Sequence, residues 1–134
     1  MNVALWIVQG LLAVLFVLTG AAKAVWSKDR LLASGQSGVA PFPVPVLRLT
    51  GVCELLGALG LVLPQATGIA RTLTPAAAVG LGVVMLGAMA SHGSLLRADR
   101  AAGRGSAEAR NIAGNVLVLA LCVFVVAGRV QGAA

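Results

Sequence analysis

Hydrophobic residues along this chain fall into four long runs, and most of the polar residues lie in the shorter segments between them. Each run approaches the ~20 residues that an α-helix needs to cross the ~30 Å hydrocarbon core of a bilayer. The runs are continuous rather than alternating, which argues against a membrane β-barrel. The pattern predicts an all-α membrane protein, a four-transmembrane-helix bundle in a single domain over residues 1–134. The expected spans are residues 3–26, 45–63, 73–91 and 112–129.

Proline and threonine suggest where the helices begin and end. Pro45 and Pro75 fall at first-turn positions, where the missing N–H costs nothing. Thr74 is the expected N-cap of the third span, and Pro64 is expected to stop the second. Between the spans we expect one short interfacial turn at residues 29–34 and a mobile, solvent-facing segment at residues 92–111.

The composition is typical of a polytopic membrane protein: 59% hydrophobic residues, 10% charged residues and a mean hydropathy of +0.97. No separate soluble domain fits in 134 residues of this kind. The net charge of +6 lies in short segments beside apolar runs, so we expect anionic lipid headgroups of the bilayer as the partner and no nucleic acid. The small-residue faces of the helices also allow the chain to form a homo-oligomer.

The distribution of Lys and Arg predicts an orientation. Eight of the ten flank the first and third connections, and only Arg71 and Arg129 lie on the other side. The positive-inside rule then places those two connections in the cytoplasm of a bacterial cell, with the N- and C-termini outside the inner membrane. The first run lacks a basic n-region, so we interpret it as a retained span rather than a cleaved signal peptide.

Glu54 is the most informative single residue. It lies deep in the second apolar run, where a carboxylate costs roughly 2.5–3.5 kcal/mol on insertion scales. The residues three and four positions away are small, which allows this face to pack closely against another helix. They are Thr50, Gly51, Gly57 and Ala58.

Polar residues of the other spans reach the same layer, and we expect Glu54 to pair with Lys23 or Arg48, with His92 and Asn115 hydrogen-bonded nearby. Thr19 lies one helical turn from Lys23, and Asn111 lies one turn from Asn115, so both are expected near this layer. Each of these residues except Glu54 also has a structural explanation: lysine and arginine reach the headgroups from span ends, the histidine lies in an exposed loop, and asparagine joins helices. We take Glu54, Lys23 and His92 as candidate catalytic residues and Arg48, Asn115 and Thr50 as candidate binding residues.

The chemistry open to such a set is proton relay, or general acid–base work on a lipid-soluble substrate. Cys53 and Cys122 lie far apart, each within an apolar run, and form no redox motif. We identify no cofactor motif and no metal-ligand cluster in the sequence.

Several segments together resemble the DoxX-like family of small four-span membrane proteins, from about residue 11 to residue 129. They are LTGAAK at 18–23, LRLTGVCELLGALGLVLP at 47–64, LTPAAA at 73–78, MLGA at 85–88 and then His92. The segment around Glu54 is the most specific, whereas the charged residues 28–30 depart from the family pattern. In this resemblance, only Lys23, Glu54 and His92 correspond to residues of the family motif.

The resemblance implies a modest set of functions. Relatives include a membrane subunit of thiosulfate:quinone oxidoreductase and proteins linked to thiol-stress complexes. Three hypotheses remain open. The chain is an accessory or quinone-side subunit of a membrane-associated oxidoreductase with a soluble redox partner. Alternatively, it is a stand-alone enzyme that uses Glu54 as acid/base on a lipid or isoprenoid. Thirdly, it is a non-catalytic assembly or transport protein in which Glu54 and Lys23 only lock the helices together.

Overall fold

The computed structural model describes residues 2–132, and their regular elements are all helical. Four helices are long, which confirms the predicted all-α, four-helix fold. A short helix and one turn of 3₁₀ helix connect the first two long helices. The elements are α1 (Asn2–Val25), α2 (Lys28–Ala33), η1 (Ser37–Val39), α3 (Val44–Thr67), α4 (Leu73–Ala101) and α5 (Glu108–Gln131).

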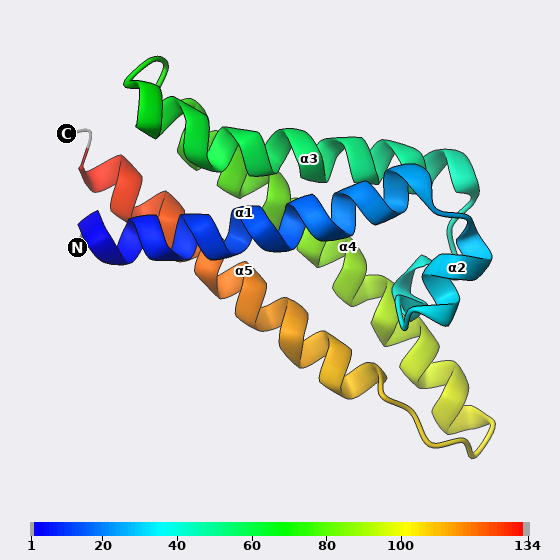
Figure 1. Cartoon of the computed structure of the whole chain (residues 1–134). Helices are drawn as coiled ribbons and strands as arrows, with labels where there is room; N and C mark the ends of the chain where they lie inside the picture. The colour runs from blue at the N-terminus through cyan, green and yellow to red at the C-terminus, as the bar shows by residue number, and fades with distance from the viewer. Residues whose placement is uncertain (1, 133–134) are drawn as a thin grey trace.

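The long helices form two antiparallel pairs, α1 with α3 and α4 with α5 (Figure 1). Both ends of the described chain and the α3–α4 turn lie at one end of the bundle, which we call the terminal end. At the opposite end the two pairs diverge, and α2 and η1 lie between them (Figure 1). We call this the linker end, after the connection that contains α2 and η1.

The long helices have the length and surface of membrane spans. They contain 24, 24, 29 and 24 residues, and all are apolar enough to cross a bilayer. Large apolar side chains cover the outside: Leu18 is 66% exposed and Leu56 is 63% exposed. Within a helix every interior backbone group is hydrogen-bonded, so such a surface is stable in hydrocarbon. The protein is therefore a multi-pass membrane protein.

The interior is a narrow apolar core along the bundle axis. Leu12 and Phe16 of α1 meet Leu61 of α3, Leu81 of α4 and Val125 of α5, and all are fully buried or nearly so. Glycine brings the helices close: a Cβ on Gly57 would lie 2.6 Å from the Leu81 side chain. This core holds the four helices in one arrangement and so determines which polar groups meet.

The helix ends differ from the prediction at several points. Pro64 lies inside α3, which continues to Thr67 and ends at Gly68, a residue in the left-handed region with φ 74°. The expectation that Pro64 stops the helix was wrong, because proline removes one hydrogen bond but a packed helix can continue past it. The N-cap of α4 is Thr72 rather than Thr74, and no side chain caps it.

The helices also extend beyond the apolar runs. α4 continues to Ala101 and α5 begins at Glu108, so only residues 102–107 separate them. The prediction of a long mobile segment at 92–111 was therefore wrong. A fall in hydropathy marks where a helix leaves the bilayer, but it does not mark where the helix ends. Residues 92–101 include Leu95 and Leu96 and contain no proline, so they can stay helical in water. The predicted turn at 29–34 is confirmed as α2.

Candidate functional site

A cavity of about 520 Å³ opens at the linker end of the bundle. All four long helices and the linker contribute to its wall. Its apolar wall includes Leu15, Phe16, Val39, Phe42 and Val118. The polar residues that line it are Thr19, Lys23, Gln36, Thr50, Glu54, His92, Arg110, Asn111 and Asn115. The diverging helix pairs thus enclose a mainly apolar space with ionisable groups in its wall.

Glu54 forms an ion pair in one wall of this cavity. Its side chain is 0% exposed, and its Oε1 lies 2.6 Å from the Nζ of Lys23. The hydroxyl of Thr19 donates to the other oxygen, Oε2, at 2.8 Å. Thr19 and Lys23 are one helical turn apart on α1, so a single face of that helix satisfies both carboxylate oxygens. The two carboxylate oxygens are thus satisfied by one charged donor and one neutral donor.

Two facing glycines bring α1 and α3 close enough for this pair. A Cβ on Gly20 would lie 2.8 Å from the carbonyl oxygen of Gly51. A Cβ on Gly51 would lie 2.7 Å from the carbonyl oxygen of Gly20. Because neither glycine has a side chain, the two backbones touch, as small residues allow in membrane helix pairs. The short Glu54 side chain therefore reaches α1 without leaving its helix.

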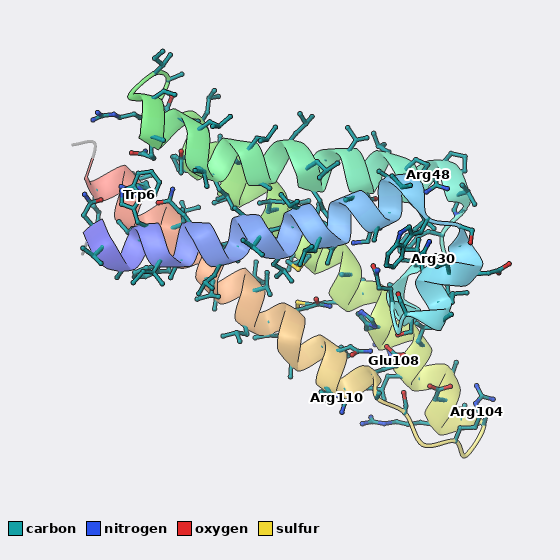
Figure 2. All side chains as sticks on the ribbon, viewed as in Figure 1. Trp6, Arg30, Arg48, Arg104, Glu108 and Arg110 are labelled. Atoms are coloured by element: carbon teal, nitrogen blue, oxygen red, sulfur yellow. The ribbon has the colours of Figure 1, made fainter. Side chains whose placement is uncertain are left out.

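His92 belongs to a second polar cluster, on the α4–α5 side of the cavity. Its Nδ1 pairs with a carboxylate oxygen of Glu108, which is 7% exposed. Asn111 Nδ2 lies 3.4 Å from the same carboxylate oxygen and 3.3 Å from Ser37 Oγ of the linker. Since Glu108 engages Nδ1, the Nε2 nitrogen is the ring atom left for another partner. Figure 2 shows Glu108 at the start of α5, close to α4.

Hydrogen bonds hold the linker over the cavity. Ser91 on α4 donates to the carbonyl oxygen of Gly38 at 2.6 Å. Lys28 donates to the carbonyl oxygens of Ala40 at 2.9 Å and Phe42 at 2.7 Å. A Cβ on Gly38 would lie 2.8 Å from His92 Nε2, so the linker backbone runs directly against the imidazole. The linker is an ordered part of the cavity wall.

Arg48 does not make the ion pair with Glu54 that the sequence left open. Its Nη1 donates instead to the carbonyl oxygens of Lys23 at 2.6 Å and Trp26 at 2.7 Å. These carbonyls lie at the C-terminal end of α1, where helix carbonyls lack partners within the helix. Arg48 is not among the cavity-lining residues, and it lies at the linker end (Figure 2). It therefore ties α3 to the end of α1.

The remaining predicted site residues are brought together only in part. Thr50 lines the cavity, but its hydroxyl donates within its own helix, to Val46 at 2.8 Å. Asn115 also lines the cavity, and its buried Nδ2 has no partner within residues 2–132. Neither Asn115 nor His92 hydrogen-bonds Glu54 in the described structure. The expected single layer is thus two clusters, one around Glu54 and one around His92.

Sequence reasoning missed Glu108 and Gln9. Glu108 lay in the segment interpreted as a loop, although it precedes Asn111 by three residues and so shares its helix face. Gln9 is a fully buried amide in the first span and donates to the carbonyl oxygen of Leu61. Its position deep in an apolar run was the signal that marks such a residue.

The residues that are present allow proton exchange and hydrogen bonding to a bound molecule. Lys23 has three N–H donors, and one of them points at Glu54. Across the described part of the chain, no three His, Cys, Asp or Glu residues lie close enough to hold a metal ion. The arrangement fits a molecule that is mostly apolar and has a few polar atoms.

Comparison with known proteins identifies a family. The model of the DoxX-like family matches residues 7–125. The match includes both polar clusters of the linker-end cavity, from Thr19 to Asn115. No curated protein and no solved structure matches the chain.

Proposed function

The chain belongs to the DoxX-like family of membrane proteins, and from that premise we propose that it is a quinone-side subunit of a membrane-associated oxidoreductase. In this proposal the linker-end cavity binds the quinone ring. A soluble redox protein supplies the two electrons, and side chains of this chain manage the two protons that quinone reduction consumes.

The observation that best supports this proposal is the ion pair of Lys23 and Glu54 in the wall of a mainly apolar cavity. A quinone has an apolar ring and tail and two carbonyl oxygens that accept hydrogen bonds. The Lys23 side chain is 15% exposed. One of its three N–H groups donates to Glu54, and the other two are left for a ligand. Lys23 is therefore our proposed hydrogen-bond donor to one carbonyl oxygen, and the Glu54 carboxylate holds the ammonium in position. A proton that Lys23 gives to the reduced quinone is replaced from water at the linker end.

His92 is the proposed donor from the other wall. Glu108 engages Nδ1, which leaves Nε2 as the ring nitrogen that can hydrogen-bond a ligand in the cavity. Asn115 supports the same interpretation, because its buried Nδ2 lacks a partner that a carbonyl oxygen would supply.

The geometry favours this function over the lipid-enzyme alternative. A general base needs a carboxylate oxygen within reach of the substrate proton. Both oxygens of Glu54 are already occupied, by Lys23 and Thr19. Acid–base catalysis by Glu54 would require one of these contacts to break, whereas quinone binding by Lys23 would leave both intact.

The charge distribution supports an orientation within this proposal. Eight of the ten Lys and Arg residues lie at or near the linker end of the bundle. By the positive-inside rule this end faces the cytoplasm and the terminal end faces outside, in a bacterial inner membrane. The soluble redox partner would then dock from the cytoplasm, on the side where the cavity opens.

Binding of a short-chain quinone tests the proposal. The full chain in phosphatidylcholine nanodiscs is titrated with decyl-ubiquinone, and tryptophan fluorescence quenching is recorded. The variant carries both Lys23→Gln and Glu54→Gln, which keeps two amides of similar size and removes both charges. We expect about tenfold weaker binding, since one charge-assisted hydrogen bond contributes roughly 1.5–3 kcal/mol.

Arg97→Gln is the matched control, because Arg97 is an exposed cation that does not line the cavity. Equal quinone affinity in all three proteins, or no saturable binding, would refute quinone binding at this site. The subunit role fails separately if a deletion strain keeps its full quinone-linked oxidation. A lipid that accumulates in a Glu54→Gln strain would instead favour the enzyme alternative.

A further inference from the structure

A second cavity, of about 600 Å³, lies at the terminal end of the bundle. It is separate from the linker-end cavity and shares no lining residue with it. Residues of α1, the end of α3, the start of α4 and α5 form its wall. Trp6 lies here, beside the C-terminal part of α5 (Figure 2). Two arginines line it, Arg71 and Arg129.

Within the described residues, only neutral groups hold Arg129 in place. Its Nε donates to Oε1 of Gln9 at 2.6 Å, and its Nη1 donates to Oδ1 of Asn2 at 2.9 Å. The guanidinium carbon lies 5.2 Å from the centre of the Trp6 ring. The remaining nitrogen, Nη2, is buried and has no hydrogen-bond partner within residues 2–132. A buried donor of a charged group without a partner is costly, so this atom points to a missing acceptor.

Gln9 makes this geometry specific. It is 0% exposed, and its amide nitrogen donates to the carbonyl oxygen of Leu61 on α3. That bond leaves the amide oxygen facing Arg129, so α3 and α1 together orient the guanidinium. An arginine that merely reached the headgroups would not need a fully buried amide to hold it.

Arg71 provides a second positive charge in the same cavity wall. Within the described residues its side chain makes no hydrogen bond and no ion pair. Among residues 2–132, no Asp or Glu lines the cavity. Two guanidinium groups thus border one space of about 600 Å³ with no opposite charge from the described chain. An anion would relieve their repulsion and accept from Nη2.

We propose that the terminal-end cavity is a binding site for a phosphate group. Guanidinium groups bind phosphate through paired, parallel N–H donors, and two arginines suit its several oxygens. Gln65 and Thr72 add neutral polar side chains to the wall, whereas Leu5 and Val130 make one side apolar. The phosphate comes either from the headgroup of an anionic phospholipid or from a free phosphate ion.

Two arms of one experiment distinguish these sources. In the first, the full chain is embedded in nanodiscs of phosphatidylcholine that contain a minor share of phosphatidylglycerol. The protein is then released from the nanodiscs, and native mass spectrometry identifies the lipid that stays bound. In the second, the chain in pure phosphatidylcholine nanodiscs is titrated with inorganic phosphate by isothermal calorimetry. The variants are Arg71→Gln, Arg129→Gln and, as a matched control for an exposed cation elsewhere, Arg97→Gln.

We expect the unchanged protein to retain one anionic lipid or to bind one phosphate saturably. Arg71→Gln should weaken that binding about fivefold and Arg129→Gln at least tenfold, and Arg97→Gln should leave it unchanged. Arg71 is exposed, and its side chain makes no hydrogen bond or ion pair within residues 2–132, so its variant decides the matter if Arg129→Gln does not fold. No saturable binding in either arm, or equal losses in Arg71→Gln and Arg97→Gln, would overturn the proposal.

Discussion

Replacing Lys23 by methionine would leave the buried carboxylate of Glu54 without its cation. Methionine keeps the length and the apolar part of the side chain, so the change removes mainly the charge. Glu54 is 0% exposed and would retain only the hydroxyl of Thr19 at 2.8 Å as a donor. Its other oxygen, which now lies 2.6 Å from the ammonium, would have no partner.

The expected loss follows from that burial. Removing one partner of a buried ion pair costs about 3–5 kcal/mol, because the other charge stays buried and unpaired. The Lys23 side chain is 15% exposed, so water or headgroups replace part of the interaction, and we expect the lower figure, about 3 kcal/mol. Changing both residues, Lys23→Met with Glu54→Leu, removes both charges and should cost less than the single change.

The assay is a double-mutant cycle on the free energy of unfolding, measured by titrating detergent-solubilised protein with sodium dodecyl sulfate. The two single variants and the double variant should show an interaction energy of about 3 kcal/mol, the upper part of the range for residues in contact. Arg97→Met removes an exposed cation and should change stability by less than about 0.5 kcal/mol. If the single effects simply add, the buried pair does not exist in solution and the reasoning is wrong.

Two further predictions concern packing and the linker. Gly20→Ala should destabilise the protein by about 2 kcal/mol, since its Cβ would lie 2.8 Å from the Gly51 carbonyl oxygen, whereas Gly10→Ala on the same helix meets nothing within 4 Å and should be neutral or stabilising. Thermal unfolding of the two variants checks this, and equal effects would mean that α1 and α3 are not in contact there. Ser91→Ala should release the linker from α4 and speed hydrogen exchange at residues 34–43, because it deletes the bond to the Gly38 carbonyl oxygen. The control Ser94→Ala deletes only a bond within α4, and equal exchange rates in the two variants would contradict a pinned linker.

The apolar runs were sufficient to predict the helices but not where they end. Pro45 marked the start of α3 correctly, because the first turn does not use its N–H. Pro64 was misleading, since whether a helix continues past a proline depends on what packs around it. The end of α4 was missed because hydropathy falls at the membrane surface, about ten residues before the helix itself ends.

The sequence predicted which residues belong to the candidate site better than it predicted which of them are in contact. Lys23 was one of two expected partners for Glu54, and the structure selects it because Gly20 and Gly51 bring that part of α1 against α3. His92 was placed near Glu54, but its partner is Glu108, on a helix turn that had been interpreted as a loop.

By itself, the sequence determined that this is a bundle of four membrane-spanning helices with a costly carboxylate inside it. Helix formation and membrane insertion depend on the properties of neighbouring residues, which can be read along one segment of chain. Only the tertiary structure decided that Glu54 meets Lys23 and Thr19, that Arg48 ties down the end of α1, and that Gln9 holds Arg129. Those contacts join residues 22 to 120 positions apart. They depend on which helix faces touch and how closely, and therefore on the packing of all four helices at once.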